Sequence, residues 1–311
     1  MLERLAGNDA LKRELGTALH SGRLPHAVLL VGEPGCGAGF AARCLAADYL
    51  YPAGGPHAEA VLKGEDTECL ALRGEGASGQ IPVKRVREAR EAIQRSALST
   101  DAAGRVLFIY GAQNLNGTQG SSANALLKII EEPPEGVLFL LTAPSAAVVL
   151  PTIRSRCAAY TIAPVPVADC AAHLRAERLP AAAAGELAFL YEGHIGTALK
   201  SWNDPPTKAA LGMAKTLCGY AAQGDTYRAL ALLTKYERDK EGFAALLWQL
   251  DQLCSAVLRR PAYGAEQCGG KDWCTLGTGD VGARVGTDLT GDGVHAMAEL
   301  RGDRTRNGQR P

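Results

Sequence analysis

Residues 32–39 have the glycine spacing of a phosphate-binding loop but lack the charged and hydroxylated members of that loop. The Walker A pattern is G-x-x-x-x-G-K-[ST], in which the lysine reaches the β- and γ-phosphates and the hydroxyl binds Mg²⁺. Here Ala38 stands at the lysine position and Gly39 at the hydroxyl position. The glycines that still permit a tight turn with inward N–H groups are Gly32, Gly35 and Gly37. The loop therefore predicts a nucleotide-binding fold that does not hydrolyse ATP.

The acidic residues of an NTPase are missing as well. Such an enzyme needs carboxylates at the end of a central strand to hold Mg²⁺ and to position water. The apolar run 106–109 predicts that strand, but Tyr110 and Gly111 follow it. Each lost charge-assisted contact is worth about 1.5–3 kcal/mol, so most nucleotide affinity should be gone. A plain glycine-rich turn is the simpler alternative, disfavoured because a predicted strand precedes the loop and a predicted helix follows it.

Short apolar runs alternate with helical patterns over the first half of the chain. The predicted strands are 27–31, 69–72, 106–110, 137–142 and 158–162, and the predicted helices are 11–19, 38–50, 83–93 and 121–130. Residues 52–66, rich in Gly, Pro and Glu, predict a loop. Alternation of this kind implies a parallel sheet covered on both faces, with ligands at the carboxyl ends of its strands. The phosphate loop, Tyr110 and Thr142 all fall at such ends.

The composition is that of a globular protein without a charge bias. Lys+Arg and Asp+Glu both number 33, so any contact with nucleic acid must come from a local patch. No apolar run approaches the ~20 residues of a membrane span, and the mixed-charge start is unlike a secretory signal. We therefore expect a cytoplasmic protein with no membrane contact. Nine scattered cysteines without a C-x-x-C pair predict free thiols.

Four further motifs are together far more specific than any one of them. They are Leu-Pro-His-Ala at 24–27, Ser-Ala-Asn-Ala-Leu-Leu-Lys at 122–128, Glu-Glu-Pro-Pro at 131–134 and Leu-Pro-Thr-Ile-Arg-Ser-Arg-Cys at 150–157. In these motifs, and in their order, the chain resembles bacterial clamp-loader subunits of the AAA+ class over about residues 6–165. The resemblance implies a role in DNA replication as a component of the DNA polymerase III holoenzyme.

The resemblance also implies a division into domains. An α/β AAA+ P-loop domain with a parallel sheet would cover residues 1–163, a small helical lid 164–204 and a helical collar segment 205–260. The Ala- and Leu-rich helical patterns of the second half agree with this. Residues 261–311 are glycine-rich without hydrophobic periodicity and predict a disordered or atypical tail. Collars of this family normally run longer, so completion of a five-subunit ring stays open.

Within this family the degenerate loop favours the delta-prime branch. The gamma/tau ATPase branch requires the lysine that Ala38 replaces. Many members carry a zinc-binding cysteine cluster after the first helix of the domain, but only Cys69 lies near that place, so we predict no metal site. Active relatives often place a sensor-2 arginine near the position of Gly196, and its absence agrees with lost nucleotide sensing. The neighbouring His194 is expected to be a solvated or capping residue of a turn.

The segment Ser155-Arg156-Cys157 has the clearest chemical role. The resemblance implies that Arg156 is an arginine finger, which reaches across a subunit interface to ATP bound by the neighbour. A guanidinium suits this task because it is always charged and binds phosphate oxygens in a fork. The simpler alternative for Arg156 is an ordinary surface or interdomain ion pair. Arg154 is expected to be a structural neighbour.

The sequence thus predicts a subunit that is not an enzyme by itself. The implied partners are the gamma/tau and delta clamp-loader subunits, the sliding clamp, and primed DNA reached through the complex. No cofactor is expected, because ATP would be bound by neighbouring subunits. The alternatives are an NTPase with a non-standard phosphate loop and a degenerate AAA+ scaffold outside replication. The basic residues of helix 83–93 could face template phosphate, although a solvated face is favoured.

Overall fold

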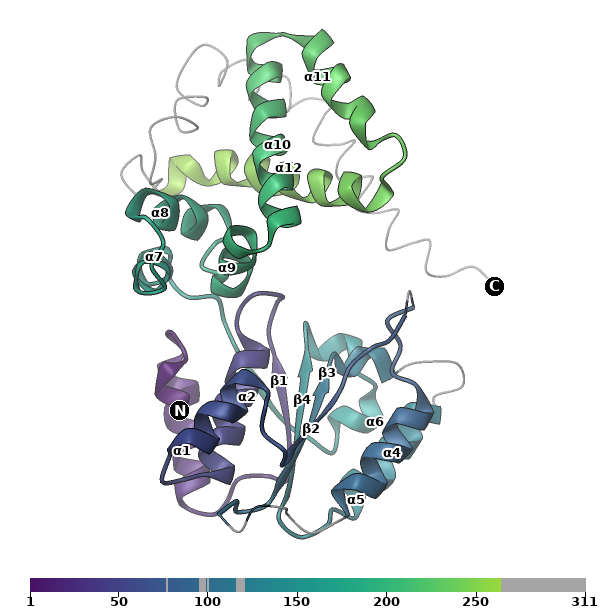
Figure 1. Cartoon of the computed structure of the whole chain (residues 1–311). Coiled ribbons are helices and arrows are strands. Elements are labelled where there is room, and N and C mark those ends of the chain that lie inside the picture. The colour runs from purple at the N-terminus through teal and green to yellow at the C-terminus, as the bar shows by residue number, and fades with distance from the viewer. Residues whose placement is uncertain (77, 95–98, 100, 116–120, 264–311) are drawn as a thin grey trace. The chain divides into compact units, whose positions relative to one another are not determined.

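The computed structural model describes residues 1–76, 78–94, 99, 101–115 and 121–263 (Figure 1). These residues pack as two compact units. The first consists of Met1–Leu174 together with Glu192–Ala198, and the second of Arg175–Tyr191 together with the described residues from Leu199 onward. The predicted tail lies, apart from the first few residues, outside the described residues.

A five-stranded parallel sheet forms the centre of the first unit. Its strands, in spatial order, are β2 (Cys69–Leu72), β3 (Arg105–Tyr110), β4 (Val137–Ala143), β1 (Ala27–Val31) and β5 (Ala158–Thr161). Every neighbouring pair is parallel; Val28, for example, pairs with Leu140 on one side and with Ala158 on the other. The predicted α/β fold with a parallel sheet is therefore confirmed, and all five predicted strands are present.

Helices cover both faces of this sheet, as Figure 1 shows. One face carries α1 (Asp9–His20), α2 (Ala38–Leu50) and α3 (Pro56–Lys63), and the other carries α4 (Val83–Ile93), α5 (Ser121–Glu131) and α6 (Pro151–Arg154). Successive residues of the central strands alternate between the two cores: Val28 and Leu30 pack on the first, and Leu29 on the second. Burial on both faces explains why these strands are continuous apolar runs in the sequence.

The remaining elements of this unit are short. Those that the structure describes include the 3₁₀ helices Leu2–Arg4 (η1), Ala112–Leu115 (η2) and Ala146–Val148 (η4). The loop prediction for residues 52–66 is wrong, because α3 occupies its middle. Pro56 is the first residue of that helix, and Gly64 ends it in a left-handed conformation with φ 78°. Proline and glycine at these two positions are helix boundary signals as well as loop signals.

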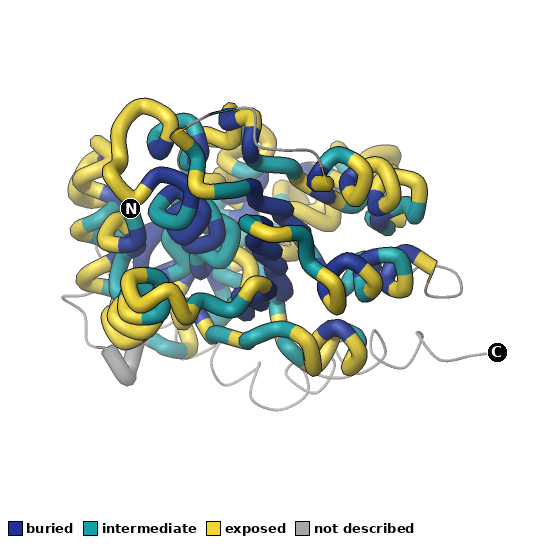
Figure 2. The backbone as a smooth tube through the Cα atoms, turned by 90° about the horizontal axis from the view of Figure 1, so that it is seen from below, coloured by how far each residue is buried: buried dark blue, intermediate teal, exposed yellow. Residues whose placement is uncertain are grey.

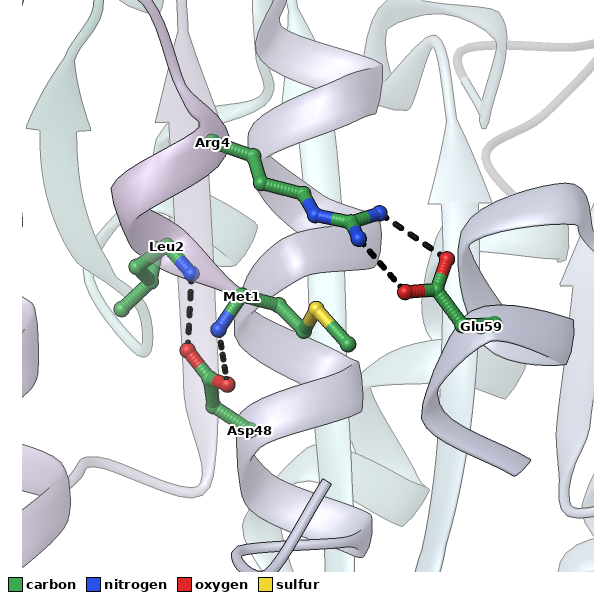
Figure 3. Close-up of polar contacts among 5 residues, drawn as sticks. All are labelled: Met1, Leu2, Arg4, Asp48 and Glu59. Carbon is green, nitrogen blue, oxygen red and sulfur yellow. Dashed lines mark hydrogen bonds and ion pairs between the residues drawn. The ribbon is translucent and has the colours of Figure 1, made fainter. Parts of the chain in front are cut away.

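The amino-terminal segment is held to two helices of the same unit by paired charges (Figure 3). Asp48 of α2 binds the terminal ammonium of Met1 and accepts a hydrogen bond of 2.8 Å from the N–H of Leu2. Arg4 forms a two-point contact with Glu59 of α3, at 2.9 and 2.5 Å. These contacts fix η1 beside the helix that follows the phosphate loop.

A buried ion pair lies at the amino end of β3. Arg105 Nε is 3.3 Å from Glu68 Oε2, and both side chains are almost fully buried. Glu68 Oε1 accepts a 2.7 Å hydrogen bond from the N–H of Ser99, and Arg105 Nη1 donates to the carbonyl of Ala92 at 2.5 Å. The pair therefore ties β2, β3 and the end of α4 together inside the protein. Figure 2 shows the buried residues concentrated between the helices.

The second unit is helical. It begins within α7 (Val167–Ala176) and contains α8 (Ala181–Leu190), the part of α9 (Ile195–Asn203) from Leu199 onward, α10 (Pro205–Gln223), α11 (Thr226–Leu233), η5 (Thr234–Tyr236) and α12 (Lys240–Tyr263). The buried Tyr191 hydroxyl lies 2.7 Å from Ser201 Oγ and 2.8 Å from Gln249 Oε1. This polar contact joins α12 to the elements near α8 and α9, and burial raises the pKa of Tyr191.

Candidate functional site

The degenerate phosphate loop joins β1 to α2. Its two middle glycines have left-handed backbones, with φ 96° at Gly35 and φ 97° at Gly37, a conformation that other residues adopt only with strain. Gly37 is the N-cap of α2, and Ala38 is the first residue of that helix. The predicted positions therefore form a strand–turn–helix. A methyl group stands at the start of the helix, where the pattern has a lysine.

A segment distant in sequence is bonded to this loop. Within the first unit, the N–H of Gly196 donates to the carbonyl of Gly35 at 2.9 Å, and Thr197 Oγ1 donates to the carbonyl of Pro34 at 3.2 Å. His194 Nε2 lies 3.1 Å from Glu33 Oε2. Residues 194–197 thus bond to three consecutive loop residues. His194, expected to be a solvated or capping residue, directly precedes α9, where its carbonyl accepts from the N–H of Ala198, and its ring contacts the Glu33 carboxylate of the loop.

Gly35 is the closest point of contact between the two segments. A Cβ atom at this position would lie 2.0 Å from Thr197 Oγ1 and 2.9 Å from the backbone nitrogen of Thr197. We expect Gly35→Ala to lower the free energy of unfolding by roughly 1–3 kcal/mol through backbone strain, and further through this clash. Urea denaturation would measure the loss. Gly54→Ala is the matched control, because Gly54 is also left-handed, at φ 75°, but has open space around its Cβ position. Equal losses in the two variants would contradict the clash.

An aromatic side chain lies beside the loop position at which the Walker A pattern has its Mg²⁺-binding hydroxyl. The ring of Tyr110, at the end of β3, is 3.4 Å from the position that a Cβ atom on Gly39 would take. The guanidinium of Arg73 lies over this ring, 4.1 Å from its centre. The neighbouring N–H of Gly111 donates to Thr142 Oγ1 at 3.2 Å. The strand ends therefore offer a cation–π pair and an internal hydrogen bond in place of carboxylates.

Arg156 lies between α6 and β5 and is half-exposed. Its Nη1 donates to the carbonyl of Thr152 at 3.0 Å and lies 3.4 Å from Ser155 Oγ. Its Nη2 is 2.5 Å from a carboxylate oxygen of Glu131, the last residue of α5. Arg154 instead donates to the carbonyl of Ala146 at 3.4 Å. Arg156 thus makes a surface ion pair, as the simpler alternative for this residue expected, but no sequence pattern indicates Glu131 as its partner.

Arg156 and the phosphate loop lie at opposite ends of two neighbouring strands of the sheet. β1 and β5 are parallel neighbours, with Val28 opposite Ala158 and Val31 opposite Thr161. Arg156 comes two residues before β5 begins, whereas the loop starts where β1 ends. A strand of this length separates its amino end from its carboxyl end by roughly 13–17 Å at ~3.3 Å per residue. The structure brings the loop, Tyr110 and residues 194–197 together, and it does not bring Arg156 to them.

Among the described residues, neither the cysteines nor the basic helix α4 forms a further site. In the described part of the chain, no three His, Cys, Asp or Glu side chains are grouped to hold a metal ion. Burial raises the pKa of the Cys44 and Cys69 thiols to about 12, as expected of structural thiols. On α4, Lys84 lies 3.9 Å from Glu88, and Arg85 lies 3.0 Å from Glu75. These acids offset part of the positive charge of the helix.

The chain is similar in sequence to bacterial replication proteins. The family model described as "DNA polymerase III, delta subunit" matches residues 7–166. The DNA polymerase III subunit delta' of Escherichia coli is 27% identical over 263 residues, which is 82% of this chain and 75% of that protein. The gamma/tau subunit of Mycobacterium tuberculosis is 35% identical over 157 residues, 49% of this chain. The chain spans only about a quarter of the length of the gamma/tau relatives that it matches.

One similar solved structure is the DNA polymerase III gamma subunit-related protein of Thermotoga maritima. The alignment covers 81% of this chain and 87% of the Thermotoga chain. Its TM-score is 0.49 at 16% identity. Among the described residues, no helix has the length and apolar character that crossing a membrane requires. The sequence match extends over the whole parallel-sheet region and includes the loop and Arg156. The chain therefore belongs to the DNA polymerase III delta-subunit family of bacterial clamp-loader proteins.

Proposed function

We propose that this chain is a non-catalytic, delta-prime-like clamp-loader subunit that supplies Arg156 to ATP bound by a neighbouring subunit. The observation that carries the proposal is the placement of Arg156 at the amino ends of the strands, whereas the phosphate loop lies at their carboxyl ends. A guanidinium there cannot serve a nucleotide on its own loop. It is half-exposed, and it therefore suits a phosphate that another molecule presents.

The state of the loop supports the non-catalytic part of the proposal. Ala38 cannot contact phosphate as a lysine does, and the ring of Tyr110 lies against the position of the missing magnesium ligand. The hydrogen bond from Gly196 engages the carbonyl of Gly35 in the loop itself. The partners in this proposal are the gamma/tau and delta subunits, the sliding clamp and, through the complex, primed DNA. The proposal places the chain in the cytoplasm, without a cofactor or metal ion of its own.

Equilibrium dialysis with labelled ATP tests the part of the proposal that concerns the phosphate loop, namely that this loop binds no nucleotide. We expect the isolated chain to show no Mg²⁺-dependent binding at micromolar ATP, because several contacts of about 1.5–3 kcal/mol each are missing. A gamma/tau subunit under the same conditions is the positive control. Micromolar, Mg²⁺-dependent binding by this chain would favour the NTPase alternative instead.

Reconstitution tests the assignment to the clamp loader. The gamma/tau and delta subunits of the same organism would be mixed with the sliding clamp and primed DNA, with and without this chain. We expect this chain to co-purify with those subunits and clamp loading to depend on it. A chain that binds none of them would support the alternative of a scaffold outside replication.

A further inference from the structure

The guanidinium that we assign to a neighbour's phosphate already has an anionic partner. Arg156 Nη2 lies 2.5 Å from Glu131 Oε1, and the two side chains are 39% and 46% exposed. Nη1 of the same group is held separately, by the carbonyl of Thr152 and the hydroxyl of Ser155. One nitrogen is therefore bonded to neutral groups of its own turn, and the other to a carboxylate.

Glu131 occupies an electrostatically poor position for a carboxylate. It is the last residue of α5, where the helix dipole is negative and favours a cation. Arg156 supplies that cation from outside the helix. Glu132, the next residue, is also exposed, and among the described residues its carboxylate takes part in no ion pair. The contact of Arg156 is thus specific to one of two adjacent carboxylates.

We propose that Glu131 competes for Arg156 with the ATP phosphate of the neighbouring subunit. This competition lowers the rate of ATP hydrolysis that the arginine finger supports. This inference rests on the proposed function. An N–H that points to the carboxylate is not available to a phosphate oxygen, and a carboxylate beside the guanidinium also repels the incoming anion. Thr152 and Ser155 hold Nη1 when Glu131 releases Nη2, so the side chain stays oriented during the exchange.

Glu131→Gln in the full complex tests this competition. Glutamine keeps the shape of the side chain but removes its charge. With the gamma/tau and delta subunits, clamp and primed DNA present, we expect single-turnover ATP hydrolysis to become roughly 1.5- to 5-fold faster, the range of an exposed ion pair. The gain should shrink as ionic strength rises, because salt screens exposed charges. A purely structural contact would instead slow hydrolysis or leave it unchanged at every salt concentration.

Three further variants separate the outcomes. Glu132→Gln removes the same charge one residue away and should leave the rate unchanged; an equal gain there would overturn the specific role of Glu131. Glu131→Gln combined with Arg156→Ala should match Arg156→Ala alone. If Arg156→Ala slows hydrolysis while Glu131→Gln does not accelerate it, the proposed competition by Glu131 is wrong, but the arginine-finger role of Arg156 is supported. If Arg156→Ala has no effect, the proposed function itself fails.

Discussion

Replacing Arg156 by alanine is expected to slow ATP hydrolysis at the site that it faces by roughly 10³–10⁵-fold, the range for an arginine finger supplied in trans. Alanine removes the charge that would stabilise the developing negative charge on the transferred phosphoryl group. The change lies outside the cores of the fold, since the side chain is half-exposed and its bonds are to the surface groups of its own turn and to Glu131. Single-turnover hydrolysis by the reconstituted complex is the measurement.

Two variants at the same turn serve as controls. Arg154→Ala removes an equal charge two residues away, where the side chain donates to the carbonyl of Ala146, and it should leave hydrolysis nearly unchanged. Arg156→Lys keeps the charge but not the planar fork, so its rate should fall between those of the native protein and Arg156→Ala. If the Arg156→Ala complex stays intact and hydrolyses ATP at the native rate, the proposal that Arg156 is an arginine finger is wrong.

Replacing Arg105 by methionine is expected to lower the free energy of unfolding by about 3–5 kcal/mol, the usual loss when one partner of a buried ion pair is removed. The variant leaves the fully buried carboxylate of Glu68 without its guanidinium, 3.3 Å away in the native protein. It also removes the donor to the carbonyl of Ala92. Urea denaturation of the isolated chain would give the difference in free energy.

The double variant Glu68→Met, Arg105→Met is the informative companion. Replacing both charges by apolar groups of similar volume is often neutral, so most of the loss should be recovered. Recovery will be incomplete, because the N–H of Ser99 loses its acceptor, Glu68 Oε1. A loss of less than about 1 kcal/mol in the single variant would mean that the ion pair is solvated rather than buried in solution.

The sequence predicted the sheet well because of how its strands are buried. β1 and β4 are covered on both faces, so each is an uninterrupted apolar run that needs no periodic analysis. The helix α3 was missed for the opposite reason. Its boundaries, Pro56 and Gly64, are the residue types that also mark loops, and its eight residues are too few for a clear periodic pattern.

The site was predicted only where its signal is local. The glycine pattern and Ala38 are adjacent in the chain, and both are found in the predicted strand–turn–helix. The bonds from His194 and Thr197 to the loop join residues about 160 positions apart and have no local signature. The pairing of Arg156 with Glu131 likewise depends on how α5 and α6 meet. The chain can be assigned to a family from motifs, but the contacts of those motifs come only from the fold.

The position of β1 in the sheet has a consequence for biosynthesis. β1 is formed by residues near the start of the chain, yet its two neighbours are β4 and β5, and Val28 pairs with Leu140 and Ala158. At about 5–20 residues per second, a ribosome needs roughly 5–25 s to deliver those partners after β1 has emerged. During that interval an entirely apolar strand has no sheet to join. The apolar strand β1 therefore lacks its complete set of sheet partners until residue 161 has left the exit tunnel.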